Sequence, residues 1–177
     1  MACLLSVLND GSRIEVATVG NEGMLGVGAF LGLDTYLWQG MSQIPGRVLQ
    51  VHADAFQEEL ERGGTLYRMV QRYTHVLLLK VTQTAACNRL HSTEQRCCKW
   101  LLLTHDRAAG DEFPLTHEFL SVMLGVRRAG VTEVASRLQK AGLIHYRRGR
   151  LTVLDRPGLE AYSCECYATI RSEFDRI

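Results

Sequence analysis

The sequence predicts an α+β fold in which a β-rich amino-terminal segment is followed by a long helix and by a helix–turn–helix with a basic hairpin. An Asp-Gly dipeptide lies between two apolar runs within residues 2–19, as is typical of a β-hairpin. Residues 65–89 contain neither Gly nor Pro and carry apolar side chains at helical spacing. Two short amphipathic stretches flank Gly125 and precede an arginine-rich turn.

The amino-terminal segment, residues 1–60, is predicted to be mostly strands. The runs CLLSVL and RIEVATV flank the Asn-Asp-Gly-Ser turn at residues 9–12. The stretch GRVLQVHADAF, residues 46–56, alternates in the way that a further strand would, and a meander or roll results. ADAFQEELER then reads as a short helix that two glycines end.

A long helix is predicted over about 65–89, within a linking segment of residues 61–91. It is either a core helix or a helix that pairs with its copy in a second subunit, and we favour pairing because it exceeds the typical length of ~11–12 residues. The candidate dimer contacts share one stripe of this helix: Leu66, Met69, Tyr73, Val76, Leu77, Lys80 and Thr84.

The last segment, residues 92–177, begins with the capping box of another helix, Ser92 with Gln95. Thr116 is a candidate N-cap, and Leu115 can pack onto Leu120 inside the helix that follows. Gly125 supplies a tight turn. A second helix then places four apolar residues inward at helical spacing: Val131, Val134, Ala135 and Leu138.

The outer face of this second helix is predicted to enter a DNA groove. Arg128 can contact guanine O6 and N7, while Thr132 and Ser136 suit phosphate or base contacts. Glu133 either accepts from cytosine or pairs with Arg137. A solvated helix start is the alternative, but cations there oppose the helix dipole. The candidate DNA-binding residues are Thr116, Arg127, Arg128, Ala129, Thr132, Glu133, Ser136, Arg137, Arg147, Arg148 and Arg150.

Charge supports this interpretation. Seven basic and two acidic residues lie within residues 116–150, so this segment has net charge +5 in a chain of net charge +1. Such asymmetry favours a polyanion-binding segment. The strands LIHY and RLTVLD are joined around Arg147, Arg148 and Arg150, and a basic hairpin beside a helix–turn–helix is a wing whose guanidinium groups would neutralise phosphates.

Six cysteines, Cys3, Cys87, Cys97, Cys98, Cys164 and Cys166, show no C-x-x-C pairs with matching second pairs. We therefore expect reduced structural thiols and no metal site. The chain start lacks the features of a signal peptide and no apolar run is long enough to span a membrane, so a cytoplasmic protein is predicted. No convergent set of titratable groups indicates an enzyme.

With these motifs in place, the chain resembles the Crp/Fnr family of transcription regulators. The resemblance rests on DGSRIEVATVGNEGMLGVGAFLG, the long helix, RCCKWLLLTHDR and LTHEFLSVMLGVRRAGVTEVASRLQKAGLI with RGRLTVLDRPGL. It implies a β-roll of the cyclic-nucleotide-binding type, partial here because the sequence starts at a mid-roll strand, then a dimerisation helix and a winged helix. Double-stranded DNA, a second copy and RNA polymerase are the implied partners.

Three departures limit what the resemblance implies. Val27 replaces the glutamate that binds ribose, and Leu37-Trp38 lies near the place of the phosphate-binding Arg-Ser, so cyclic AMP is not expected. The clustered amino-terminal cysteines of the iron–sulfur branch are absent as well. Ala129 and Glu133 differ from the usual recognition helix, so the operator cannot be transferred. The alternative function is a ligand-sensing or protein-interaction module whose winged helix no longer binds DNA.

Overall fold

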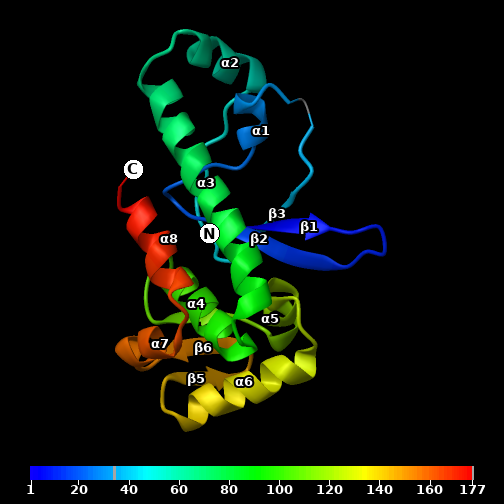
Figure 1. Ribbon diagram of the computed structural model, residues 1–177, viewed down its shortest axis with the longest axis vertical. Coiled ribbons are helices and arrows are strands. Elements are labelled where there is room, and N and C mark those ends of the chain that lie inside the picture. Colours follow the sequence, from blue (N-terminus) through cyan, green and yellow to red (C-terminus); the bar gives the residue numbers. More distant parts are fainter. Residues whose placement is uncertain (34, 177) are drawn as a thin grey trace.

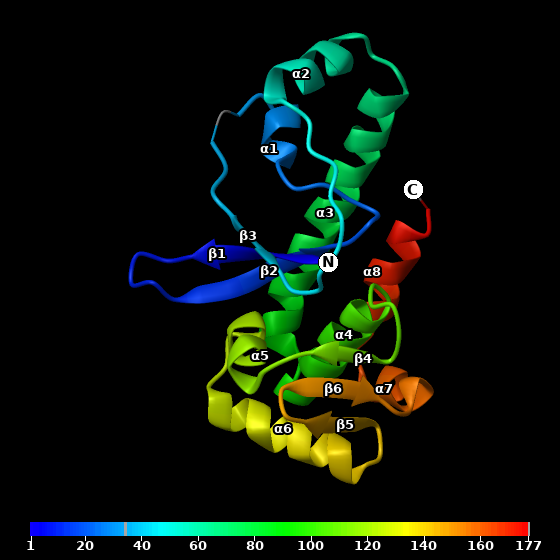
Figure 2. The ribbon, with the colours of Figure 1, turned by 180° about the vertical axis from the view of Figure 1, so that it is seen from behind.

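A computed structural model of the chain describes residues 1–33 and 35–176. The molecule is elongated along α3 (Thr65–Leu90), which runs from α1 (Val27–Phe30) and α2 (Ala53–Glu61) at one end toward a helical domain at the other (Figure 1). A small sheet packs against the middle of α3. The helix α6 (Arg128–Lys140) lies at the opposite end of the molecule from α2, as the reverse view in Figure 2 also shows.

The amino-terminal sheet confirms the predicted hairpin. Strands β1 (Ala2–Val7) and β2 (Arg13–Val19) pair antiparallel, and the Asp10 carboxylate accepts hydrogen bonds from the backbone and hydroxyl of Ser12 in the turn. A third strand, β3 (Gln39–Ser42), pairs antiparallel with the other edge of β1, so the order is β2-β1-β3.

The expected strand over 46–56 does not form. Residues 46–52 have no regular structure, and helix α2 begins at Ala53. Val48 and Leu49 are 89% and 104% exposed. An alternating pattern makes a strand only where a neighbouring edge accepts its hydrogen bonds, and within the part of the chain that the structure describes no strand pairs with this segment.

The long helix α3 confirms the prediction over 65–89, but most of the stripe assigned to a dimer lies inside the protein. Tyr73 and Leu77 pack with residues of β1 and β2, and Val76 is 1% exposed. The Lys80 ammonium donates to the backbone carbonyl of Thr18 at 2.6 Å. Tyr73, Leu77 and Lys80 contact the sheet of the same chain and Val76 is buried as well, so these four side chains cannot form an exposed dimer face. Leu66 and Thr84 are half-buried and Met69 is exposed.

Helix α4 (Thr93–His105) begins at the predicted capping box and lies in the largest apolar cluster of the molecule. Its Trp100 indole donates to the Glu15 carboxylate of β2 at 2.8 Å. Burial raises the pKa of Glu15, and the Trp100 hydrogen bond opposes that effect. Arg107, just past the end of α4, pairs with Glu22 in the loop after β2 at 2.5 Å. These contacts fasten the sheet to the following domain.

The carboxyl-terminal domain contains the two predicted helices and the hairpin, together with elements that the sequence did not reveal. Strand β4 (Glu112–Pro114) lies between α4 and the first of the two helices and makes a sheet of order β4-β6-β5. Its other elements are α5 (His117–Leu124), α6 (Arg128–Lys140), β5 (Ile144–Arg147), β6 (Arg150–Val153), α7 (Arg156–Tyr162) and α8 (Cys166–Phe174).

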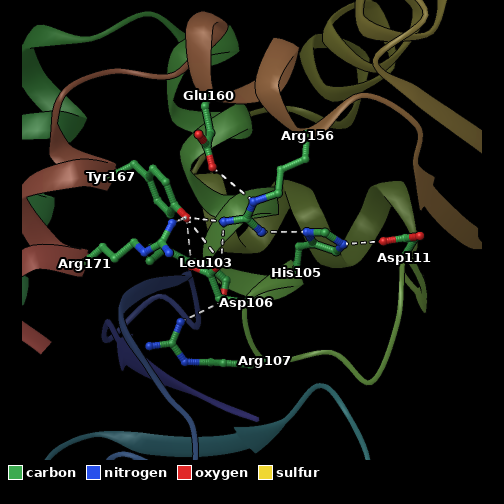
Figure 3. A network of polar contacts seen from close by, with 9 residues as sticks. All are labelled: Leu103, His105, Asp106, Arg107, Asp111, Arg156, Glu160, Tyr167 and Arg171. Atoms are coloured by element: carbon green, nitrogen blue, oxygen red, sulfur yellow. Dashed lines mark hydrogen bonds and ion pairs between the residues drawn. The ribbon is translucent and has the colours of Figure 1, made fainter. Parts of the chain in front are cut away.

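A polar network centred on Arg156 holds α7 and α8 to the end of α4 (Figure 3). The Arg156 guanidinium lies 2.6 Å from Asp106 and 2.8 Å from the His105 ring, and a third bond reaches Glu160. The Tyr167 hydroxyl of α8 donates to the same Asp106 at 3.1 Å. The Arg156 and Asp106 side chains are 28% and 24% exposed, and the network joins three helices through one guanidinium.

Within the described residues all six cysteines are buried and none forms a disulfide. Cys97 and Cys98 pack in the α4 core as expected of structural thiols. The interpretation of all six as separate thiols did not foresee that Cys87, Cys164 and Cys166 gather in one cluster. No helix within residues 1–33 and 35–176 is long and apolar enough to cross a membrane.

Candidate nucleic-acid interface

A tight glycine turn joins α5 to α6. The Thr116 hydroxyl caps α5 by accepting from the Phe119 backbone N–H at 3.0 Å, and Leu115 and Leu120 are both buried, as the sequence predicted. Gly125 ends α5 with φ +60°, a left-handed conformation that glycine adopts without strain. Helix α6 begins three residues later, so two short helices pack directly on each other.

The two faces of α6 differ as the sequence predicted. The four inward residues, Val131, Val134, Ala135 and Leu138, are 0–4% exposed and lie in the core. The outward positions are all exposed: Arg128, Ala129, Thr132, Glu133, Ser136 and Arg137. This face lies at the end of the molecule, where no other described element covers it (Figures 1 and 2).

The arginines at the start of α6 are free. Arg127 is the N-cap residue without a side-chain capping bond, and Arg128 is the first helical residue. Both are exposed, and within the described residues neither forms an ion pair or a side-chain hydrogen bond. Two unpaired cations at the positive end of a helix repel each other and the helix dipole, so an anionic partner would relieve that repulsion.

The wing is a β-hairpin with a two-residue turn, and its arginines lie at the tip. Arg147 of β5 pairs with Arg150 of β6, and Arg148 and Gly149 connect them with φ +50° and +75°. Positive φ at both positions is typical of a type I′ turn. Arg147 and Arg148 are exposed and form no ion pair among residues 1–33 and 35–176.

The wing tip is held against the start of α5. The Gly149 carbonyl accepts from the Leu115 backbone N–H at 2.9 Å, and the Tyr146 hydroxyl donates to the Leu115 carbonyl at 2.6 Å. His117 stacks on Tyr146 with 4.5 Å between ring centroids, and its Nδ1 lies 3.1 Å from the Thr132 hydroxyl of α6. One imidazole therefore contacts both the wing and the recognition helix.

Electrostatics agree with this arrangement. Burial lowers the pKa of His117, and the positive charge of Arg128 lowers it further. The Thr132 hydroxyl donates to the Arg128 carbonyl, so Nδ1 of His117 supplies the proton of the contact between His117 and Thr132. The Arg128 charge also acts on Tyr146, whose pKa is raised overall by burial. The start of α6 and the wing therefore share one positive field.

Two of the candidate arginines are engaged in surface ion pairs. Arg137 pairs with Glu94 of α4 at 2.5 Å, and not with Glu133 as the helical spacing allowed. Arg150 pairs with Glu112 of β4, also at 2.5 Å. Each arginine side chain remains 55% exposed, and such pairs contribute little to stability, so both can exchange their partner for a phosphate.

His117 and Tyr146 were not among the predicted site residues. A histidine at the first position of a helix and an aromatic residue two positions before a hairpin tip are ordinary features of a sequence. The sheet order β4-β6-β5 brings the Tyr146 ring of β5 to the start of α5, which follows β4. The hydroxyl of Thr116 was predicted as both a cap and a DNA contact, and the structure shows the cap.

Residues 95–162 match the model of the Crp-like helix-turn-helix domain. This part of the chain is a Crp-like helix-turn-helix domain. The Crp-like domain thus extends from α4 through the recognition helix and the wing to α7.

The Crp-like domain together with the part of the chain that precedes it is similar in fold to several solved structures. A CRP-family transcriptional regulator of Thermus thermophilus, TTHB099, is 21% identical, with a TM-score of 0.69 over 92% of this chain and 83% of that one. TTHA1359 of the CRP/FNR family, from the same organism, is 17% identical with a TM-score of 0.68 over 92% and 82%. FixK2 of Bradyrhizobium japonicum is 13% identical with a TM-score of 0.67 over 92% and 83%.

The chain therefore has the fold of Crp/Fnr-type transcription regulators, and the predicted resemblance is confirmed at the level of the fold and of the Crp-like domain. No curated protein matches the sequence.

Proposed function

We propose that the protein binds double-stranded DNA in a sequence-specific manner through the Crp-like domain and regulates transcription. The observation that carries this proposal is the convergence of four arginines, unpaired within the described residues, on either side of His117: two at the start of α6 and two at the wing tip. Helix α6 would enter the major groove while the wing neutralises flanking phosphates.

The arginines have different proposed roles. Arg128, at the first position of α6, is placed to reach a base edge, where a bidentate contact with guanine contributes ~1–3 kcal/mol of discrimination. Arg147 and Arg148 lie on the hairpin and contact phosphate, which contributes affinity without sequence preference. Thr132 supports Arg128 indirectly, because His117 and the Arg128 carbonyl already engage its hydroxyl.

The test is a titration of a pool of genomic fragments at several salt concentrations. We expect selective retention of fragments that share a near-palindromic site, with affinity falling steeply as salt rises. The double variant Arg147→Ala/Arg148→Ala should weaken binding to every fragment and reduce the salt slope by ~2. As a matched control, Arg62→Ala/Arg68→Ala removes two exposed arginines remote from the Crp-like domain and should change neither. Absence of binding at low salt would contradict the proposal and favour a protein-interaction module.

The protein is further proposed to act as a dimer. The contact is assigned to the opposite face of α3, because the predicted face is buried within the chain at Tyr73, Val76, Leu77 and Lys80. On that face Leu78 is 62% exposed, and the small residues Thr82, Ala85 and Ala86 allow close approach of a second helix. Two recognition helices about 34 Å apart would then read both half-sites.

Sedimentation at micromolar concentration tests this dimer. A dimeric wild type that Leu78→Asp converts to monomer is expected, together with weaker binding of the palindrome. A monomeric wild type would contradict it. We also propose, from the family resemblance, that the protein contacts RNA polymerase. This proposal requires that the dimer binds DNA.

We further propose that the amino-terminal segment, residues 1–60, does not bind cyclic AMP. Val27 is 4% exposed within an apolar cluster, and Trp38 packs against the same cluster. The Val27 side chain offers neither a charge nor a hydrogen bond for the ribose, and Trp38 carries no charge to pair with the phosphate. Calorimetric titration with cyclic AMP should show no binding, and saturable binding would contradict this part of the proposal.

A further inference from the structure

Four potential metal ligands gather where α3 ends. Cys87 and His91 lie one helical turn apart at the carboxyl end of α3, Cys164 lies in the connection from α7 to α8, and Cys166 is the first residue of α8. The three sulfur atoms and one imidazole nitrogen all lie within 4.8 Å of one another. The residues come from segments more than seventy positions apart, so only the fold brings them together.

Two of the distances between these atoms match those around one tetrahedral ion. Bonds of about 2.3 Å to sulfur and 2.0–2.1 Å to nitrogen place the ligand atoms about 3.5–3.8 Å apart. The Cys87 and Cys164 sulfurs are 3.6 Å apart, and the Cys166 sulfur lies 3.5 Å from Nδ1 of His91. A multinuclear iron–sulfur cluster would spread its ligands over several metal atoms and require wider separations.

The surroundings suit a metal centre as well. Nε2 of His91 lies 3.2 Å from the Glu165 carboxylate, which orients the ring and leaves Nδ1 facing the sulfurs. The Gln83 amide donates to the Cys166 sulfur at 3.1 Å. The three cysteines are 0–4% exposed, so water competes little for the ligand positions.

Positive charge next to the cluster offsets the charge of bound thiolates. A divalent ion with three thiolates and one neutral imidazole leaves one negative charge. The ammonium of Lys99, 7% exposed on α4, acts on Cys87.

Simple packing of thiols explains less of this arrangement. Cys97 and Cys98 of α4 are equally buried but lie outside the cluster and have no imidazole or amide directed at their sulfurs among the described residues. A disulfide between Cys87 and Cys164 would involve only two of the four ligands, and would leave His91, its carboxylate partner and Cys166 without a role.

We propose that Cys87, His91, Cys164 and Cys166 bind one Zn²⁺ ion that fastens the end of α3 to the α7–α8 connection. The site has the three-cysteine, one-histidine composition of closed structural zinc sites, in which all four positions come from the protein. It lies at the junction between the long helix and the Crp-like domain, so bound metal would fix the direction in which that domain leaves α3. The proposal is independent of DNA binding.

The experiment uses the full chain, purified under reducing conditions and freed of metal with a chelator. Titration with Co²⁺ should give visible absorption of a tetrahedral site and a thiolate charge-transfer band, both saturating at one equivalent and both lost on adding Zn²⁺. Elemental analysis of the protein before chelation should find about one zinc per chain.

Variants separate the site from other thiols. Cys164→Ser and His91→Ala should lose the one-equivalent endpoint, whereas Cys97→Ala, which removes a buried thiol outside the cluster, should keep it. Since a ligand variant can also fail to fold, Glu165→Gln supplies a second test at an exposed position and should weaken zinc affinity about 10–100-fold in competition with a chelating dye.

The proposal is overturned if the reduced wild type takes up no Co²⁺, or if Cys97→Ala loses the metal as Cys164→Ser does. Iron with acid-labile sulfide in place of zinc would also overturn it, as would a Cys87–Cys164 disulfide in protein kept under reducing conditions.

Discussion

The ring of His117 stacks on that of Tyr146, with 4.5 Å between centroids and 31° between ring planes. This contact joins the first residue of α5 to the wing strand β5, and Nδ1 of His117 lies 3.1 Å from the Thr132 hydroxyl on α6. Three elements that would face DNA thus meet at one side chain. The positions of the wing arginines and of the α6 amino terminus relative to each other depend on it.

Replacement of His117 should loosen the wing. His117→Ala removes an aromatic pair that contributes about 0.5–1.5 kcal/mol, and we expect a loss of that size in the free energy of unfolding together with weaker DNA binding. Urea unfolding and a binding titration measure the two effects. His52→Ala, at an exposed helix start without a side-chain capping bond, is the matched control. Unchanged affinity in His117→Ala would show that the wing arginines do not need this contact.

The Gly125 turn should tolerate no side chain. A Cβ there would lie 2.6 Å from the Cδ1 atom of Ile14, and φ is +60°. Gly125→Ala is therefore expected to destabilise the protein by more than Gly11→Ala, whose φ is +80° but which has open space around it. Adding Ile14→Val to Gly125→Ala removes the obstructing methyl and should recover part of the difference. Equal losses for the two alanine variants in urea unfolding would contradict the contact.

Lys80 should make stability depend on pH. Burial, with the charge of Arg107 adding to it, lowers the pKa of Lys80 to about 7, whereas an unfolded lysine titrates near 10.4. Between these values the unfolded chain binds one more proton, so the free energy of unfolding rises with pH, by at most about 1.4 kcal/mol per unit from this group.

Lys80→Met removes that dependence, so the stability of the wild type relative to the variant should increase from pH 7 to pH 10. Urea unfolding at both values measures it, and Lys140→Met, on the exposed face of α6, should follow the wild type. Parallel pH profiles for the wild type and Lys80→Met would contradict the assignment.

The sequence predicted the elements that local signals specify. The capping box at Ser92, the turn at Gly125 and the inward face at Val131, Val134 and Leu138 all depend on neighbours within a few residues, and all are confirmed. The expected strand at residues 46–56 failed because alternation cannot show whether a pairing edge exists. Most of the predicted stripe of α3 is buried, but periodicity cannot tell whether a helix face packs against its own sheet or against a second copy of the chain.

The contacts that sequence reasoning missed join distant segments. Tyr146 reaches His117 because β4 and β5 both pair with β6, and Cys164 reaches Cys87 because α8 packs against α3. Two local signals did point to the cysteine cluster: a cysteine and a histidine four positions apart on one helix, and a Cys-x-Cys at the start of another. Neither signal alone has the spacing of a known site, and their combination depends on tertiary structure.

The most direct test of DNA reading is a comparison of base preferences between the wild type and Arg128→Ala. Each protein selects binding sites from a randomised duplex pool, and the enriched sequences are aligned. The wild type should enrich a two-fold site with a guanine at equivalent positions of both half-sites. Arg128→Ala should lose the preference at those positions, by about 5–150-fold, while Arg148→Ala weakens all sites and keeps the preference. Identical preferences in the wild type and Arg128→Ala would contradict the account.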